Sequence, residues 1–300
     1  MIIARVRGGL GNQLFQYAAA KALAVQHNTQ LKLDLYYFTK HPYRTFDLDK
    51  FKLPLEIAAR SEVHRFTGSN PLIRYINKRE NYLHCPKVAV QPHYHYYEDF
   101  FKLPGHIYLS GYWQSEKYFT PVRDSMRQWV EPREPLDPKS QELASEMTRC
   151  ESVSLHVRRG DYNAATYNSF FGGLTESYYK RAVTRILQEV PDARFFVFSD
   201  DIEWCKNNLP IPDALYADHN KGHDSYKDLY LMSCCRHNII ANSSFSWWGA
   251  WLNKNPDKKV IAPARWFQKE YVDGRMVVYP CRIYNVKDLI PPAWIKIGEE

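Results

Sequence analysis

Residues 225–252 of this 300-residue chain, SYKDLYLMSCCRHNIIANSSFSWWGAWL, decide its fold class. Apolar residues recur at helical spacing from Ser225 to Cys235, and a short apolar strand follows from Asn238 to Ala241. A second helix is predicted from Ser246 to Leu252, after a polar turn. Helices and strands that alternate this closely indicate a parallel sheet with helices on both faces.

The same alternation extends on both sides of this stretch. In the second half we expect strands at 153–157, 195–198, 214–216 and 259–261, and helices at 139–148, 176–189 and from 202. In the first half we expect strands at 2–6, 31–38 and 107–112 and helices at about 13–27 and 116–130, with an irregular middle. The proline-rich segment EPREPLDP, residues 131–138, cannot continue a helix and marks the joint between two domains, 1–134 and 135–300.

Composition excludes several classes of protein. With 45% hydrophobic residues the chain can build a proper core, which excludes a disordered protein. No apolar stretch reaches the roughly 20 residues that a membrane-spanning helix needs, and MIIARVRGG lacks the apolar region of a secretory signal, so we expect a cytoplasmic protein. The net charge of +7 favours phosphate-bearing ligands or peripheral association with the anionic inner membrane surface. No basic block indicates nucleic acid.

Polar clusters follow four predicted strands of the second half: HVRRGDY at 156–162, SDD at 199–201, ADHN at 217–220 and NSSFSWWG at 242–249. The carboxyl ends of parallel strands meet at one edge of a sheet, which is where ligands bind. There Arg158 can hold a phosphate with its planar guanidinium, or form a surface ion pair with Asp161. His156 lies on an otherwise apolar strand, where a half-buried, hydrogen-bonded histidine is the ordinary interpretation.

Two turns have both a structural and a functional interpretation. Asn242, Ser243 and Ser244 precede a helix, where they either cap it or form an anion site with the N–H groups of its first turn. Asn12, in the turn RGGLGNQ, is in the first place a candidate N-cap. The glycines of this turn form an incomplete dinucleotide-binding pattern, which disfavours a nicotinamide cofactor.

Other catalytic patterns are weak or absent. Asp47 and Asp49 have the spacing of a divalent metal site, but they alternate with Phe46 and Leu48 as in a solvated strand or turn. The sequence has no nucleophile elbow, zinc-protease helix or Walker loop. We therefore expect a site that uses arginine and backbone dipoles, without a metal ion or a separate cofactor.

Four blocks of sequence resemble one enzyme family: RGGLGNQLFQYAAAKALA at 7–24, GYWQSEKYF at 111–119, HVRRGDY at 156–162 and DLYLMSCCRHNIIANSSFSWWGAWLN at 228–253. They are similar to blocks of the bacterial α-1,2-fucosyltransferases of glycosyltransferase family 11. The resemblance implies a GT-B-like α/β fold, in which two Rossmann-like domains face a cleft. It also implies inverting transfer of L-fucose from GDP-β-L-fucose to O2 of a terminal galactose, in the synthesis of O-antigen or another surface glycan. Residues 1–134 would then bind the acceptor and residues 135–300 would bind GDP-fucose.

The resemblance gives the central role to Arg158, which would hold the β-phosphate of GDP between His156 and Asp161. Charge accumulates on that phosphate as fucose leaves, and a preorganised arginine with helix N–H groups would stabilise it. The acceptor hydroxyl needs a proton sink, for which Asp161, Glu176, the departing phosphate and His156 are candidates. The carboxylate that serves the related α-1,6 enzymes has no match in this sequence.

The resemblance implies further contacts. Ser243 and Ser244 match a serine pair that contacts the diphosphate, and Asp228 lies where α-1,6 enzymes place a carboxylate against guanine. Asn12 matches an asparagine beside the reacting centre of a protein O-fucosyltransferase. Three neighbours complete the expected nucleotide-binding set: Gly11, Asn242 and Phe245.

Two alternatives stay open. A non-catalytic carbohydrate-binding module would hold glycans on an aromatic surface at Tyr94 to Tyr97 and Trp113, since Tyr and Trp stack on sugars and also hydrogen-bond. The 22 Tyr and 8 Trp residues of the chain fit such a surface. A GT-B transferase that uses another nucleotide sugar would keep the fold and change only the donor.

Overall fold

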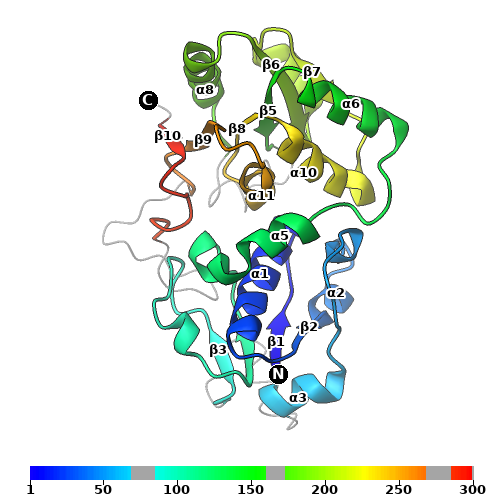
Figure 1. Cartoon of the computed structure of the whole chain (residues 1–300), viewed down its shortest axis with the longest axis vertical. Coiled ribbons are helices and arrows are strands. Elements are labelled where there is room, and N and C mark those ends of the chain that lie inside the picture. Colours follow the sequence, from blue (N-terminus) through cyan, green and yellow to red (C-terminus); the bar gives the residue numbers. More distant parts are fainter. Residues whose placement is uncertain (69–84, 160–172, 268–284, 299–300) are drawn as a thin grey trace. The chain divides into compact units, whose positions relative to one another are not determined.

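The computed structural model describes residues 1–68, 85–159, 173–267 and 285–298, and the chain divides into two compact units (Figure 1). Within these ranges, the first unit contains the residues up to 130 together with 285–291. The second unit contains residues 131–267 and 292–298. Asp161 lies outside the described residues, so its expected contact with Arg158 stays a prediction.

The first unit is built on a four-stranded parallel sheet in the order β2-β1-β4-β3. Its strands are β1 (Ile2–Arg5), β2 (Leu31–Asp34), β3 (Val88–Val90) and β4 (Ile107–Ser110). Ile2 and Ile3 point to opposite faces of the sheet, and both are 0% exposed. The central strand β1 is therefore covered on both faces.

Helix α1 (Leu10–Gln26) follows β1 in the chain. Alanines 18, 19 and 20 favour a helix and, being small, allow close packing, and all three are buried. The N-cap is Gly9, so the helix begins before the expected residue 13 and Asn12 lies inside its first turn. The interpretation of Asn12 as the N-cap is therefore wrong. Gly8, with a φ of +78°, supplies the turn between strand and helix.

The remaining helices of this unit differ most from the prediction. They are α2 (Tyr36–Lys40), α3 (Arg60–Thr67), α5 (Arg123–Trp129) and the 3-10 helices η1 (Leu48–Lys50), η3 (Phe100–Lys102) and η4 (Glu116–Val122). The strand expected over 31–38 ends at Asp34, because Asp34 Oδ1 accepts the N–H of Tyr36 (2.9 Å) and α2 begins there. The helix expected over 116–130 is divided into η4 and α5, since Pro121 interrupts it.

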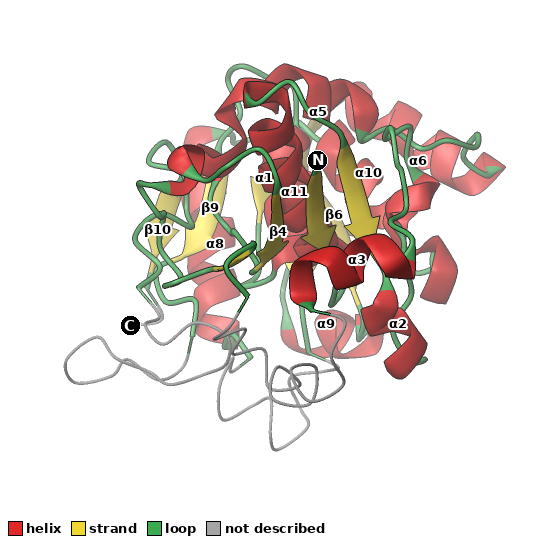
Figure 2. Cartoon of the chain, turned by 90° about the horizontal axis from the view of Figure 1, so that it is seen from below, coloured by secondary structure: helices red, strands yellow, loops and turns green. Residues whose placement is uncertain are grey.

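The second unit has a six-stranded parallel sheet. Its strands are β5 (Glu151–Val157), β6 (Ala193–Ser199), β7 (Leu215–Ala217), β8 (His237–Ile239), β9 (Val260–Pro263) and β10 (Ile295–Ile297). Its helices are α6 (Pro138–Thr148), α8 (Glu176–Glu189), α9 (Ile202–Asn208), α10 (Ser225–Cys234), α11 (Ser244–Leu252) and the 3-10 helix η6 (Gly222–Asp224). Figure 2 shows the helices in red and the strands in yellow. Every element expected in this half is present, and η6 and β10 are additional.

Strand order locates the place in each sheet where a ligand is expected. In the second sheet the order is β10-β9-β8-β5-β6-β7. The chain starts this sheet at β5, adds β6 and β7 on one side of it, and then adds β8, β9 and β10 on the other side. The order reverses between β5 and β8, and in the first sheet it reverses between β1 and β4. Ligands of doubly wound sheets bind at such switch points, outside the carboxyl ends of the strands. The expected α/β class with two Rossmann-like sheets is confirmed.

The division of the chain differs from the expected boundary between residues 134 and 135. The first unit ends at Val130, and residues 285–291 belong to it as well. Asp288 accepts hydrogen bonds from the N–H of Tyr96 (3.1 Å) and from Lys117 Nζ (2.6 Å), and Leu289 is buried. These contacts between residues far apart in sequence tie the late segment to the first unit.

Candidate functional site

Arg158 lies just beyond β5, at the switch point of the second sheet. Leu155 and Val157 are fully buried in the core between the sheet and α8, so β5 is fixed up to the arginine. Arg158 Nε forms an ion pair with Asp200 Oδ2 at 3.2 Å. Because Val157 pairs in register with the last residue of β6, Asp200 leaves the neighbouring strand at the same level. A carboxylate of the next strand therefore orients Arg158 before any ligand binds.

The neighbouring Arg159 makes a different set of contacts. Its backbone N–H donates to Asp200 Oδ1 (2.9 Å), and its Nε lies 3.3 Å from Asp201 Oδ2. Its guanidinium stacks on the ring of Trp204, with the central carbon 3.8 Å from the ring centroid. Arg159 therefore fastens the end of β5 to α9, whereas Arg158 stands at the switch point.

His156, two residues before Arg158, is more deeply buried than expected. It is 4% exposed, and its ring centroid lies 5.7 Å from that of Phe245 in α11. Burial, together with the nearby Arg158 charge, lowers the pKa of His156 to about 3. Among the described residues, His156 Nδ1 has no hydrogen-bond partner. The imidazole is neutral near pH 7, and its low basicity makes it a poor proton sink.

We expect His156 to make the protein sensitive to acid. The unfolded histidine takes up a proton below about pH 6.5, whereas the folded one stays neutral down to about pH 3, so stability is lost as pH falls. Between pH 7 and pH 4 this single group should lower the free energy of unfolding by about 3 kcal/mol. Urea titrations at both pH values, on the wild type and on His156→Gln, measure the difference. A matched control is His223→Gln, at an exposed position. An equal loss in wild type and His156→Gln would contradict the prediction.

The turn before α11 lies at the carboxyl end of β8, on the other side of the switch point. Ser243 is the N-cap, and its Oγ accepts the N–H of Phe245 at 3.3 Å. Asn242 is 3% exposed and donates from Nδ2 to the carbonyl of Trp266 (3.1 Å). The capping interpretation is therefore confirmed for Ser243. The positive end of the α11 dipole also begins here, at Ser244, and anion binding at this turn stays a prediction.

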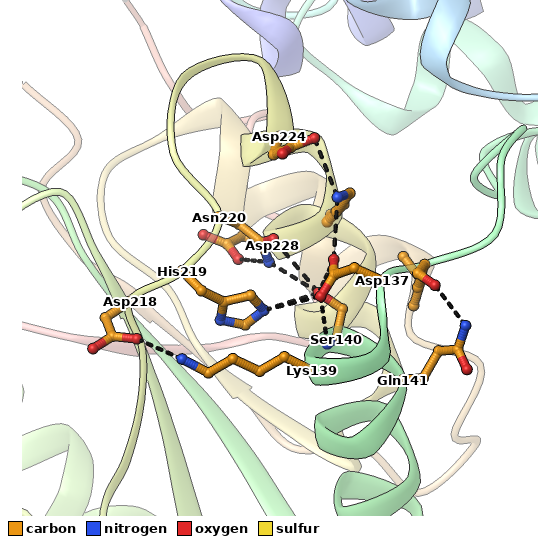
Figure 3. A network of polar contacts seen from close by, with 11 residues as sticks. Asp137, Lys139, Ser140, Gln141, Asp218, His219, Asn220, Asp224 and Asp228 are labelled. Carbon is orange, nitrogen blue, oxygen red and sulfur yellow. Dashed lines mark hydrogen bonds and ion pairs between the residues drawn. The ribbon is translucent and has the colours of Figure 1, made fainter.

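Asp228, in the first turn of α10, belongs to a polar network next to this edge (Figure 3). Asn220, which follows β7 and is 8% exposed, donates from Nδ2 to Asp228 Oδ1 at 2.8 Å. Burial raises the pKa of Asp228 to about 7, with the Asn220 hydrogen bond acting against the rise. A carboxyl group that is half ionised near neutral pH is unusual, and such groups concentrate at functional sites.

The rest of the network fixes the loop that holds Asn220. Asp137 is the N-cap of α6, and it accepts the N–H of Ser140 (3.0 Å) and the ammonium of Lys227 (3.1 Å). Partial burial would raise the pKa of Asp137, but these hydrogen bonds hold it well below the usual range. The Ser140 hydroxyl contacts His219 Nε2 (2.9 Å), as Figure 3 shows. The network thus joins the start of α6, the loop after β7 and α10.

Asn12 and Gly11 lie at the switch point of the first sheet, in the first turn of α1. Asn12 Oδ1 accepts a hydrogen bond from Gln114 Nε2 at 2.5 Å, and Gln114 follows the end of β4. Gly11 is buried. Sequence reasoning missed Gln114, because the only local signal for it is its place in the block GYWQSEKYF.

The structure also describes residues of the carbohydrate-binding alternative and of the weak metal pattern. Trp113 is 1% exposed and Tyr94 is 5% exposed, so these rings belong to the core and cannot form a sugar-binding surface. Asp47 Oδ1 accepts the hydroxyl of Thr45 (2.8 Å) in a turn. Within the described part of the chain, no three His, Cys, Asp or Glu side chains are grouped as metal ligands.

The structure thus gathers part of the predicted site. His156 and Arg158 on the β5 side and Ser243 and Phe245 on the β8 side belong to one switch point, with Asp200 as an unpredicted orienting partner of Arg158. A second group, in the other unit, contains Gly11 and Asn12 with Gln114. Each switch point therefore has its own set of polar side chains.

Comparisons with known proteins agree on one family. The model of glycosyl transferase family 11 matches residues 92–279. The chain is 36% identical to an alpha-1,2-colitosyltransferase of Escherichia coli, over 99% of both chains. It is 33% identical to the O-antigen biosynthesis glycosyltransferase WbnK of Escherichia coli, over 87% of this chain and 93% of that protein. Galactoside alpha-(1,2)-fucosyltransferase 1 of Rattus norvegicus is 26% identical, over 98% of this chain and 72% of that protein.

Proposed function

The chain belongs to glycosyl transferase family 11, and we propose that it transfers L-fucose from GDP-β-L-fucose, with inversion and without a metal, to O2 of a terminal galactose. The observation that carries this proposal is the position of Arg158 at the β5–β8 switch point, where Asp200 orients it and where α11 begins after the neighbouring strand β8. Relatives named for alpha-1,2 transfer of colitose and of fucose support the linkage. The relative named for O-antigen biosynthesis supports a surface glycan as the product.

Arg158 would stabilise the leaving group. As the bond between fucose and the β-phosphate breaks, negative charge accumulates on the phosphate and positive charge on the sugar. A guanidinium that Asp200 already orients needs no reorganisation at that moment, which is what makes such a group effective. Ser243, Ser244 and the first N–H groups of α11 would add donors on the β8 side. Asn242 and Phe245 shape this turn and would complete the pocket.

Asp228 would recognise the base of the nucleotide. An ionised carboxylate accepts the two N–H donors on the edge of guanine, and adenine lacks this pair. Asn220 holds the Asp228 carboxyl group by one oxygen, which fixes its direction. Specificity for GDP over ADP then follows from a half-buried acceptor that only guanine can satisfy.

The acceptor hydroxyl attacks from the face opposite the leaving phosphate, and its proton needs an acceptor. The low pKa of His156 and the ion pair between Glu176 and Lys180 (2.9 Å) weigh against these two side chains. Asp161 and the departing phosphate are thus the preferred proton acceptors, and Asn12 would lie beside the reacting centre.

A second donor has a specific observation in its favour. The relative with 36% identity is named for colitose, which is fucose without its hydroxyl group at C3. A pocket for fucose and a pocket for colitose would therefore differ only where they contact this one hydroxyl group. GDP-L-colitose is therefore the alternative donor to test.

Donor competition tests the proposed function. Purified protein is incubated with a galactose-terminated oligosaccharide and GDP-L-fucose, GDP-L-colitose or GDP-D-mannose, and GDP release and the product linkage are measured. We expect an α-1,2-fucosylated product, at a rate that EDTA leaves unchanged, and no transfer of mannose. A preference for GDP-L-colitose would replace the donor and keep the mechanism. Absence of transfer from both deoxy sugars, or a loss in EDTA that Mg²⁺ restores, would contradict the proposal.

The location of the protein stays a prediction. No helix among the described residues is long and apolar enough to cross a bilayer. We expect a cytoplasmic enzyme that associates peripherally with the inner membrane surface through its net positive charge.

A further inference from the structure

The switch point of the first sheet contains a fixed pair of side-chain amides. Strands β1 and β4 are parallel neighbours, with Ile2 paired to Ile107 and Ala4 paired to Leu109, so both strands end at the same edge of the sheet. Asn12 comes from the turn and helix after β1, and Gln114 comes from the segment after β4. Their hydrogen bond therefore lies at the switch point, where this sheet is expected to hold its ligand.

The backbone around Asn12 is shaped for this contact. Gly8 has a φ of +78°, and a Cβ atom at Gly8 would lie 2.9 Å from Asn12 Nδ2. Such a contact is too close, so only glycine leaves room for the Asn12 side chain in this position. With its Oδ1 accepting a hydrogen bond from Gln114, Asn12 has Nδ2 as the donor that it can offer to a ligand.

Gln114 follows a segment, residues 111–113, whose backbone is strained but firmly held. Trp113, which precedes it, has a φ of +54° although it is a bulky residue, and it is 1% exposed. Gln91 Oε1 accepts the N–H groups of both Tyr112 (2.8 Å) and Trp113 (3.0 Å). A Cβ atom at Gly111 would lie 2.5 Å from Gln91 Cβ, so the segment cannot shift easily. Strain that the surroundings maintain in this way is typical of functional sites.

The stability of the fold does not explain the polarity of Gln114. Its side chain is 5% exposed, and Oε1 has no hydrogen-bond partner among the described residues. Exchanging the oxygen and nitrogen positions in the carboxamides of both Asn12 and Gln114 would keep the hydrogen bond between them. The Gln114 nitrogen would then lack a partner in place of its oxygen. A buried polar atom without a partner is unfavourable, so an apolar side chain of the same size would suit the fold better.

We propose that Gln114 is a positioning residue, which holds the carboxamide of Asn12 so that its Nδ2 donates a hydrogen bond to a hydroxyl group of the bound sugar. This inference rests on the proposed glycosyl transfer and adds a residue to it. A hydroxyl oxygen accepts such a donor, and it can belong either to the acceptor or to the transferred sugar. A carboxamide misplaced by even a small distance would lose most of its effect on the reaction.

A double-mutant cycle tests the proposal. We expect Gln114→Met to lower kcat/KM about tenfold and Asn12→Ala to lower it about 10²-fold. Because Gln114 acts through Asn12, the double variant should be no slower than Asn12→Ala alone, whereas independent effects would multiply to about 10³-fold. Gln26→Met is the matched control, since exposed Gln26 of α1 also donates one hydrogen bond, to the carbonyl of Phe101 (2.7 Å). It should leave the rate unchanged.

Hydrolysis of the donor identifies the hydroxyl group. If the hydroxyl belongs to the acceptor, Gln114→Met slows transfer and leaves the hydrolysis of the GDP-sugar by water unchanged. If it belongs to the transferred sugar, both rates fall by the same factor. A GDP affinity that stays constant in a titration excludes a general loss of structure.

A measurement without turnover separates this proposal from the proposed function. In ¹⁵N NMR spectra, Gln114→Met should shift the side-chain amide signals of Asn12, and Gln26→Met should not. Should neither GDP-fucose nor GDP-colitose be turned over, the proposed function would fail, and this spectrum would still decide whether Gln114 positions Asn12. Multiplicative kinetic effects, or unchanged Asn12 signals, would overturn the proposal.

Discussion

Replacing Arg158 with alanine should lower kcat about 10²- to 10³-fold and weaken the binding of GDP, because the variant lacks the guanidinium expected at the β-phosphate. The fold should survive, since Arg158 is at the edge of the sheet and its ion pair with Asp200 is partly exposed. Initial rates with GDP-fucose, calorimetric titration with GDP and a melting curve measure the three effects.

Two further variants make this test specific. Arg158→Lys keeps the charge but lacks the planar fork, so we expect it to recover only part of the rate. Arg194→Ala removes an arginine from the same sheet. Arg194 lies at the start of β6 and forms an ion pair with Glu146 of α6. This position is at the edge opposite the carboxyl ends, so the variant should bind GDP normally. Equal losses in Arg158→Ala and Arg194→Ala would show that the first effect is structural.

Replacing Asp228 with asparagine should weaken the binding of GDP about 10²-fold at pH 8, because a hydrogen-bonded carboxylate is exchanged for a neutral amide. Since the pKa of Asp228 is raised to about 7, the wild type must release a proton to bind guanine below that pH. Its affinity for GDP should therefore fall about tenfold per pH unit from pH 7 to pH 5. The affinity of Asp228→Asn should stay constant over the same range, as titrations at several pH values would reveal.

The same substitution should stabilise the protein at alkaline pH. The unfolded aspartate loses its proton near pH 4, whereas the folded one keeps it up to about pH 7, so the wild type loses stability as pH rises through this window. Relative to the wild type, Asp228→Asn should gain about 4 kcal/mol at pH 8 and little at pH 4. Asp218→Asn is the control, because this exposed carboxylate pairs with Lys139 on the surface. If Asp228→Asn bound GDP as tightly as the wild type at pH 8, Asp228 would not be part of the nucleotide-binding site.

The second unit could be predicted almost completely from the sequence. Its strands are short apolar runs separated by amphipathic helices, and each of these signals lies within a few consecutive residues. The helix expected over 176–189 has the same bounds in the structure. The polar cluster after β5 was expected at the sheet edge because the edge follows directly from a parallel sheet.

Features that depend on distant residues could not be predicted. The ion pair of Arg158 with Asp200 joins the ends of two neighbouring strands, and no signal close to Arg158 in the sequence indicates it. The hydrogen bond between Asn12 and Gln114 joins residues 102 positions apart, and the sequence around each of them has no pattern that predicts it. In the same way, Asp288 reaches Tyr96 and Lys117 across most of the chain. Such pairs are set by strand order, which local periodicity does not contain.

The central claim is that the nucleotide binds at the β5–β8 switch point and that its diphosphate is held by Arg158 and the start of α11. A crystal structure of the protein with GDP tests this most directly. We expect both terminal nitrogens of Arg158 within hydrogen-bond distance of the β-phosphate, the N–H groups near Ser243 facing the same phosphate, and guanine against Asp228. A diphosphate bound at the opposite edge of the sheet, away from Arg158, would contradict the account.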